Sequence, residues 1–163
     1  INQSINQSIN MQLSSILLIA AFTSVFAFAN AKYFFVSTPR SFEDAQFICA
    51  EFGGKLVVIR NSAENTLVKR LVINESRKDK FYESVWIGYK KTGSSFKSVD
   101  GAVTISNRRM TSSKTRYNNW AYGEPNNWRN SEHCAILKDD GKWNDLNCLS
   151  HRRFVCEMLE QRK

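Results

Sequence analysis

The chain has 163 residues, of which 42% are hydrophobic, and it carries a formal net charge of +8. It contains no heptad pattern, collagen-like stretch or second domain, so these architectures are excluded, and its length suits one domain with its own core. The basic balance favours polyanionic partners such as sulfated glycans or bacterial surface polymers. The basic residues are scattered rather than periodic, and we interpret most of them as a solvated surface.

The N-terminal segment has the pattern of a secretory signal. Residues 1–31 contain no Asp, Glu, Lys or Arg, and an apolar run over 16–28 is followed by a small residue at Ala31. Such a run precedes signal-peptidase cleavage and is shorter than the roughly 20 apolar residues of a membrane-spanning helix. We therefore expect a leader and signal peptide at 1–31, with the signal proper at 11–31, and a secreted domain at 32–163. For such a chain we expect no nucleic-acid partner and no transmembrane segment.

The first elements of the expected domain are a strand and a helix. The letters YFFV at 33–36 predict a short aromatic strand. Ser41 with Asp44 forms a variant of the capping box that begins a helix, and the glycines at 53–54 end it. The residues expected on the inner face of this helix are Phe42, Ala45, Cys49 and Phe52.

A buried strand and a second helix follow. The letters KLVVI at 55–59 predict the strand, and Asn61 followed by Glu64 predicts the start of the helix. The inner face of this second helix is expected to contain Leu67, Val68, Leu71 and Val72.

The remaining segments are mostly strands around one irregular stretch. Strands are predicted for VWIGYK at 85–90, for FKSVDGA with its Asp-Gly turn, for CAILK at 134–138 and for RFVCEM at 153–158. Between them, 102–133 lacks periodicity, and a stretch of that length inside a compact domain is usually functional. The order of elements predicts an α+β fold, with two helices packed on antiparallel sheets and a long irregular ligand-binding loop region.

Four cysteines lie in the expected mature domain, at positions 49, 134, 148 and 156. An even number after a signal peptide predicts two disulfides, for which spacing alone allows three connectivities. A zinc site is the alternative. It is poorly supported because the sequence has no C-x-x-C pair and only His133 and His151 could assist.

Oxygen-bearing side chains gather on both sides of the second cysteine in the sequence. They are Glu124, Asn126, Glu132, Asn144 and Asp145. Ca²⁺ takes about six to eight oxygen ligands of mixed charge, so this set favours calcium over a softer metal. Three carboxylates close together without a cation would repel one another.

Together these features resemble the C-type lectin domain in its short, four-cysteine form, over about 33–158. The letters that carry the resemblance are WIG at 86–88, EPN at 124–126, WND at 143–145 and FVCE at 154–157. The resemblance implies disulfides Cys49–Cys156 and Cys134–Cys148. It also implies a cis peptide bond before Pro125, which would turn both flanking side chains towards one ion.

The resemblance also implies how a sugar is held. In the family, two vicinal hydroxyls of a monosaccharide complete the coordination of calcium held by the five oxygen-bearing residues. Each hydroxyl donates to a carboxylate and accepts from an amide. We expect Glu124 to pair with Asn126 and Glu132 with Asn144, while Asp145 acts mainly as an ion ligand.

The acid–amide order of EPN resembles the mannose-type version, which prefers mannose, N-acetylglucosamine or fucose. Trp128 stands where galactose-type members often carry an aromatic ring, so it could stack on a sugar or anchor its own loop. Asn127 and His133 occupy positions where members with a second ion carry acids. The YKKTGSS stretch after WIG also lacks carboxylates. We therefore expect one functional calcium ion.

The predicted function is that of a secreted, calcium-dependent carbohydrate-binding protein without enzymatic activity. Microbial surface glycans are plausible targets, in innate immunity or symbiont recognition, and oligomers would raise avidity. The alternative is a module on the same fold that binds protein or polyanionic ligands, with calcium only structural. Asn74 begins an N-glycosylation sequon, and Trp86, Trp120 and Trp143 are expected in the core and loop scaffold.

Overall fold

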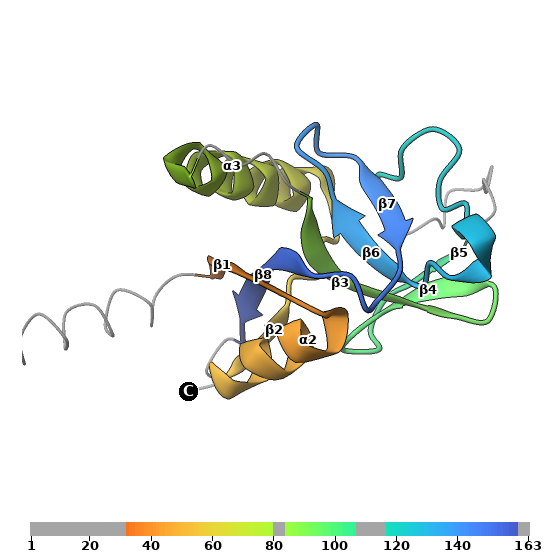
Figure 1. The fold of residues 1–163 in the computed structure, drawn as a ribbon, viewed down its shortest axis with the longest axis horizontal. Coiled ribbons are helices and arrows are strands. Elements are labelled where there is room, and N and C mark those ends of the chain that lie inside the picture. Colours follow the sequence, from red (N-terminus) through yellow and green to blue (C-terminus); the bar gives the residue numbers. More distant parts are fainter. Residues whose placement is uncertain (1–31, 80–83, 107–116, 160–163) are drawn as a thin grey trace, which may run out of the picture. The chain divides into compact units, whose positions relative to one another are not determined.

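The structure is a computed structural model that describes residues 32–79, 84–106 and 117–159. The expected leader and signal peptide lie outside these residues. Figure 1 shows the arrangement of the elements. In chain order they are β1 (Tyr33–Arg40), α2 (Phe42–Glu51), β2 (Gly54–Leu56), α3 (Ser62–Asp79), β3 (Val85–Thr92), β4 (Ser95–Ser98), β5 (Thr104–Ser106), the 3-10 turn η1 (Trp128–Asn130), β6 (Cys134–Leu137), β7 (Trp143–Leu146) and β8 (Arg152–Met158).

The strands of the described residues form one sheet, and with the two helices they confirm the α+β fold. Strand β8 pairs antiparallel with β1 and with β2, and β3 pairs antiparallel with β4 and with β6. Strands β3 and β8 run parallel, with Trp86 opposite Phe154, so the sheet is mixed. The last antiparallel pairs are β4 with β5 and β6 with β7.

Helix α2 begins and ends as its sequence predicts, but one residue of its inner face is misplaced. The Ser41 hydroxyl accepts a hydrogen bond from the Asp44 amide at 3.2 Å and donates to Asp44 Oδ2 at 2.7 Å. Gly53 follows the helix with φ of 75°. Phe52, predicted to be buried, is 57% exposed. It lies beyond the last helical residue, where the periodicity no longer applies, and its ring packs edge-on against Phe34 at 5.4 Å.

Helix α3 buries a narrower stripe than the sequence predicts. The Asn61 side chain accepts a hydrogen bond from the Glu64 amide at 2.8 Å, which begins the helix. Val68 and Val72 are buried, whereas Leu67 is 53% exposed and the prediction for it was wrong. The buried stripe runs through Asn65, Val68 and Val72, and Leu67 lies beside it.

The predicted strand at 55–59 is shorter in the structure. Only Gly54–Leu56 belongs to the sheet ladder, although Val57, Val58 and Ile59 are fully buried. The Val58 amide donates to the buried carboxylate of Glu157 at 3.2 Å instead of to a strand. A side chain far along the chain therefore ends this strand.

The irregular stretch at 102–133 contains the short strand β5, which the sequence did not predict. Its residues 107–116 lie outside the described part of the chain. The segment from 117 to 133 lies at the side of the molecule away from α3 (Figure 1). Two buried tryptophans anchor the surrounding scaffold: Trp86 donates from Nε1 to Arg40 O at 2.9 Å, and Trp143 donates to Asn65 Oδ1 at 2.8 Å.

Trp120 completes this scaffold from the irregular segment itself. Its half-buried ring packs against Phe96, with centroids 4.8 Å apart, and against Trp143 at 5.7 Å. The main chain beside it is tied down as well, because the Trp143 amide donates to Asn119 O and the Ala121 amide donates to Trp143 O, both at 2.9 Å. This packing fixes the loop that leads to Glu124.

Candidate functional site

The antiparallel pair β6–β7 brings the two halves of the predicted site together. Ala135 lies opposite Asp145 in the register, and Cys134 lies opposite Leu146. A disulfide joins Cys134 to Cys148, whose Cα atoms are 5.2 Å apart. The second disulfide joins Cys49 to Cys156, so the pairing is the one that the resemblance implies.

The loop that contains Glu124 is held on Asp145. The Glu124–Pro125 bond is cis. The Asn126 amide donates to Asp145 Oδ1 at 3.0 Å, and the Asn127 amide donates to Asp145 Oδ2 at 2.8 Å. Asp145 is completely buried, so its carboxylate fixes the position of the loop's main chain relative to β7. Within the loop, the Asn126 side-chain amide donates to Glu124 Oε1 at 2.9 Å.

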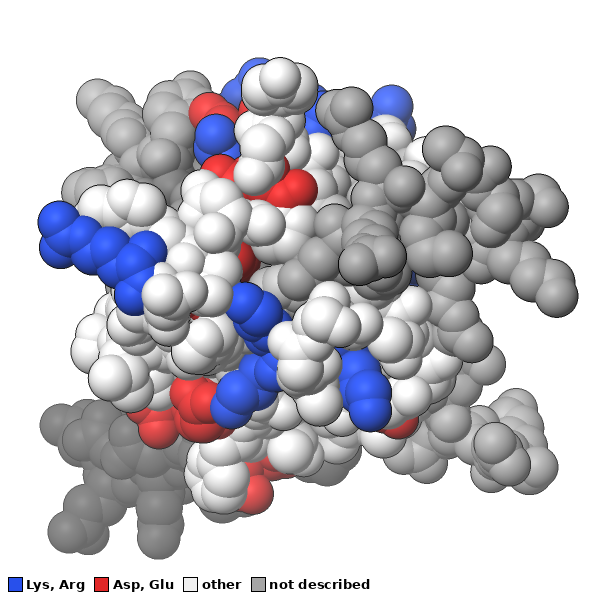
Figure 2. Space-filling model, turned by 90° about the vertical axis from the view of Figure 1, so that its right-hand side faces the viewer, with Lys and Arg blue, Asp and Glu red and all other residues white. Residues whose placement is uncertain are grey.

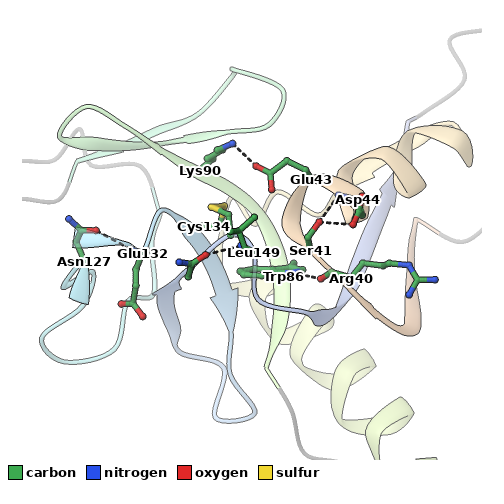
Figure 3. Close-up of a disulfide and its surroundings, with 12 residues drawn as sticks. Arg40, Ser41, Glu43, Asp44, Trp86, Lys90, Asn127, Glu132, Cys134 and Leu149 are labelled. Atoms are coloured by element: carbon green, nitrogen blue, oxygen red, sulfur yellow. Dashed lines mark hydrogen bonds and ion pairs between the residues drawn. A yellow bond between two sulfur atoms is a disulfide. The ribbon is translucent and has the colours of Figure 1, made fainter. Parts of the chain in front are cut away.

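Glu132 is connected to the same loop through Asn127. The Glu132 amide donates to Asn127 Oδ1 at 3.2 Å, and the Trp128 amide donates to Glu132 Oε2 at 3.2 Å. Figure 3 shows the Asn127 side chain bonded to the Glu132 main chain, with the Glu132 carboxylate pointing away from Asn127. The sequence singled out Asn127 only as a missing acid for a second ion. In the structure it organises the loop, and an asparagine just after EPN is the signal that could have suggested this role.

Asn144 reaches the site from β7. Alternation along the strand places its side chain on the opposite face from Asp145, and it is half-buried. Its side-chain nitrogen donates to Asp145 O at 2.8 Å, which leaves the side-chain oxygen and the second N–H of the amide available to a ligand. Glu132 and Asn144, which the resemblance pairs around one hydroxyl, make no hydrogen bond to each other in the described structure.

The pKa values of Glu124 and Glu132 are raised by burial and by neighbouring carboxylates. Burial raises the pKa of Glu124 above its usual range, and Asp145 and Glu132 raise it further. Burial likewise raises the pKa of Glu132, and Asp145 adds to this effect. Within the described residues no Lys or Arg forms an ion pair with any of the three. The negative charge therefore lacks a protein counterion there.

The donor set fits calcium in kind, but its carboxylates are not drawn together. Within the described residues, ligand atoms of three acidic, Cys or His side chains lie within 4.8 Å of one another only at Glu43, Cys134 and Cys148. Both of those sulfurs belong to the disulfide, so this group is not a metal site. The oxygens of Asp145 each accept one amide, and a carboxylate oxygen has a second lone pair for an ion.

Two aromatic side chains stand beside this set. Trp128 is 57% exposed, so it does not anchor the loop in the core, and Tyr122 is 95% exposed. The guanidinium carbon of Arg129 lies 4.1 Å from the centroid of the Trp128 ring. Such a cation–π contact contributes about 0.5–1 kcal/mol at an exposed site. The sequence pattern predicted a role for Trp128 but not for Arg129 or Tyr122, although an Arg that directly follows a loop Trp is a signal for such a contact.

The other predicted residues lie at the surface. His133 and His151 are exposed, and Asn74 is exposed on α3 while Ser76 of its sequon is buried. Glycosylation of Asn74 stays a prediction. Figure 2 shows basic side chains interspersed with acidic and uncharged ones over one face of the molecule. Within the described residues, no helix is both long and apolar enough to cross a membrane.

Comparison with known proteins places this geometry among related domains. The family model of the lectin C-type domain matches residues 38–158. A mannose-binding protein of Gallus gallus is 36% identical over 112 residues, which is 68% of this chain and 37% of that protein. The chain thus spans well under half the length of this curated relative.

Two solved structures share the fold. The human scavenger receptor C-type lectin carbohydrate-recognition domain has 31% identity and a TM-score of 0.58, covering 77% of this chain and 88% of its own. The cow C-type carbohydrate-recognition domain of CD23, solved in the presence of a GlcNAc2Man3 oligosaccharide, has 26% identity and a TM-score of 0.62. That match covers 80% of this chain and 88% of the cow chain.

Proposed function

Because the chain belongs to the C-type lectin domain family, we propose that it is a secreted, calcium-dependent carbohydrate-binding protein that recognises mannose-type sugars. As a domain of this family it is a binding module and not an enzyme. The proposed ligands are mannose, N-acetylglucosamine and fucose, with microbial surface glycans as plausible carriers. The relative named as a mannose-binding protein supports this choice of sugar.

The observation that carries the proposal is the arrangement of Glu124 and Asn126. Their side chains hydrogen-bond at 2.9 Å, and the Asn126 amide is fixed on buried Asp145. A carboxylate acceptor and an amide donor therefore stand side by side at the rim of the site. A sugar hydroxyl needs one acceptor and one donor, and this pair offers both.

In the proposed complex the five residues have different binding roles. When bound, calcium would supply the positive charge that draws two sugar hydroxyls into the site. Glu124 and Glu132 would accept the hydroxyl protons, and Asn126 and Asn144 would donate to the hydroxyl oxygens. Asp145 would hold the EPN loop in place through the Asn126 and Asn127 amides.

Retention on immobilised mannose tests the proposal. The folded protein should bind the matrix in millimolar calcium and elute with EDTA or with free mannose. Galactose at the same concentration should elute less protein. Failure of a folded protein to bind in calcium would contradict the mannose-type specificity.

The net charge of +8 favours a second candidate, in which the domain binds polyanions and calcium is only structural. Polyanion binding should weaken steeply as ionic strength rises, since it depends on counterion release or screening. Binding through a calcium-held hydroxyl pair should depend on calcium and change little with salt. A salt titration with heparin and mannose matrices in parallel separates the two candidates.

Weak sites are commonly used in several copies, so self-association would raise avidity. Light scattering at binding concentrations measures this directly. A strict monomer there would contradict self-association, whereas the sugar specificity is tested independently of it.

A further inference from the structure

We propose that Arg129, held on the ring of Trp128, selects sugars that carry an anionic substituent next to the calcium-binding hydroxyls. This inference rests on the proposed function and deepens it by naming a class of acidic ligand. The class consists of monosaccharides with a carboxylate, sulfate or phosphate group.

The first observation is that the guanidinium of Arg129 has no oppositely charged partner within the described residues. Its carbon lies 4.1 Å from the Trp128 ring centroid. Within the described residues, the Arg129 side chain makes no hydrogen bond or ion pair, although Glu124, Glu132 and Asp145 lie in neighbouring segments. The planar donors of an Arg that is stacked but unpaired stay available for an oxyanion.

The second observation is that the backbone holds Arg129 in an unusual conformation. Its φ is 53°, and Asn127 and Asn130 on either side of the turn also have positive φ, at 49° and 56°. Asn tolerates this left-handed region, whereas a long side chain such as Arg enters it at a cost. Main-chain bonds from Asn130 to Asn127 O at 2.8 Å and from Ser131 to Trp128 O at 3.2 Å fix the turn.

The third observation ties this turn to the ion-binding carboxylates. The Trp128 amide donates to Glu132 Oε2. The main chain that carries the indole is therefore bonded directly to a predicted calcium ligand, and Arg129 is the next residue. Trp128 is 57% exposed, and one face of its ring is already covered by Arg129. A sugar bound at Glu132 would therefore meet an indole that carries a cation on one of its faces.

The indole and the guanidinium together define the chemistry of the expected ligand. The uncovered face and edge of the indole can contact apolar C–H groups of the sugar. Arg129 can then bind an oxyanion on an adjacent carbon. A neutral sugar leaves the guanidinium to water, so it should still bind, though without the added charge contact.

The test compares neutral and acidic sugars on the full chain in calcium at physiological salt. The probes are mannose against mannose 6-phosphate, N-acetylglucosamine against its 6-sulfate, and glucose against glucuronic acid, each measured by competition for a mannose matrix. At least one acidic probe should bind about three- to fivefold more tightly than its neutral parent, the size expected for an exposed ion pair. Equal or weaker binding of all three acidic probes would overturn the inference.

Variants separate a ligand contact from general charge. Arg129→Gln should remove the preference while leaving mannose binding within about twofold, and Arg70→Gln makes the same charge change on the exposed face of α3 and should keep the preference. Arg129→Lys keeps the charge without the planar stack and should lose most of the preference. Full preference in Arg129→Lys, or its loss in Arg70→Gln, would overturn the role of the stacked guanidinium.

A structural role for the stack is tested by thermal unfolding. The melting temperature of Arg129→Gln should lie within a few degrees of that of Arg70→Gln, which is the drop expected from losing one exposed cation–π contact. An equal loss of neutral and acidic sugar binding in Arg129→Gln would contradict the inference. Absence of calcium-dependent binding to any neutral sugar by the unmodified chain would instead contradict the proposed function, so the two failures are distinguishable.

Discussion

Glu124 is the residue on which the proposed site depends most directly. It hydrogen-bonds the Asn126 side chain and lies close enough to Asp145 for that group to raise its pKa. We predict that Glu124→Gln lowers calcium affinity at least about tenfold, because the number of anionic ligands sets affinity in oxygen sites. Isothermal titration with calcium measures the loss.

Glu51→Gln is the matched control for this variant. Glu51 is exposed at the end of α2, and its replacement by Gln makes the same change in net charge away from the site. Equal calcium affinity in the two variants would mean that Glu124 is not a ligand.

Asp100 illustrates a residue whose charge stabilises the fold itself. Burial alone would raise its pKa, but hydrogen bonds from Ser98 and Lys55 outweigh burial and hold the pKa well below the usual range. Its carboxylate also contacts Arg60 at 3.3 Å. Because the folded pKa is lowered, this stabilisation is present above the unfolded pKa of about 4 and is lost as the pH falls below it.

We therefore predict that Asp100→Asn lowers the free energy of unfolding at pH 7 by about 1–2 kcal/mol. The difference from the unmodified chain should shrink as the pH falls from about 4 towards 2. Urea unfolding across this pH range gives the measurement. A difference that stays constant over the range would show that the stabilisation does not depend on the charge of Asp100.

At the scale of elements, β6 and β7 are the frame of the site, and the Cys134–Cys148 disulfide closes them. That bridge spans 14 residues, whereas Cys49–Cys156 spans 107. In the loop-entropy account, the longer loop contributes more, about 4–5 kcal/mol against about 3 kcal/mol.

We predict that a Cys49→Ala/Cys156→Ala variant unfolds more easily than a Cys134→Ala/Cys148→Ala variant. The second variant should nevertheless lose more calcium affinity per unit of lost stability, because it frees the segments that carry Glu132 and Asp145. Denaturant unfolding and calcium titration of both variants provide the comparison. A calcium affinity that simply followed overall stability would contradict this local role.

Element prediction succeeded where the signal was local. The sequence predicted the helix caps at Ser41 and Asn61 and the glycine after α2, because each depends on contacts within a few residues. The depth of each helix face was not readable, as Leu67 and Phe52 show. Periodicity gives the direction of a side chain, whereas burial depends on what packs opposite it.

At the scale of the whole molecule, the site is a set of mutually repelling carboxylates that an ion should stabilise. A ligand that binds only the folded state raises stability with its concentration, by about 2.7 kcal/mol at 100 times its dissociation constant. We predict that calcium raises the melting temperature by the amount that corresponds to a stabilisation of this size, and that EDTA reverses the rise.

Magnesium at the same concentration is the control, because it holds its water and demands a tighter geometry. An equal shift with magnesium would indicate general screening of the carboxylates. No shift with calcium in a folded protein would contradict an ion site at Glu124, Glu132 and Asp145.

What the sequence determined by itself was the chemistry of the molecule. It established an α+β order of elements, an even number of cysteines, and a set of carboxylate and amide oxygens of the kind calcium prefers, because these depend on residue type and short spacing. The tertiary structure decided how these parts meet. Asn127 organises the loop on Asp145, and Glu157 accepts a hydrogen bond from the amide of Val58, which lies 99 residues before it and just past the end of β2. Arg129 covers one face of Trp128 because the turn folds it back there. These features depend on contacts between distant segments or on loop conformation, which no local pattern specifies.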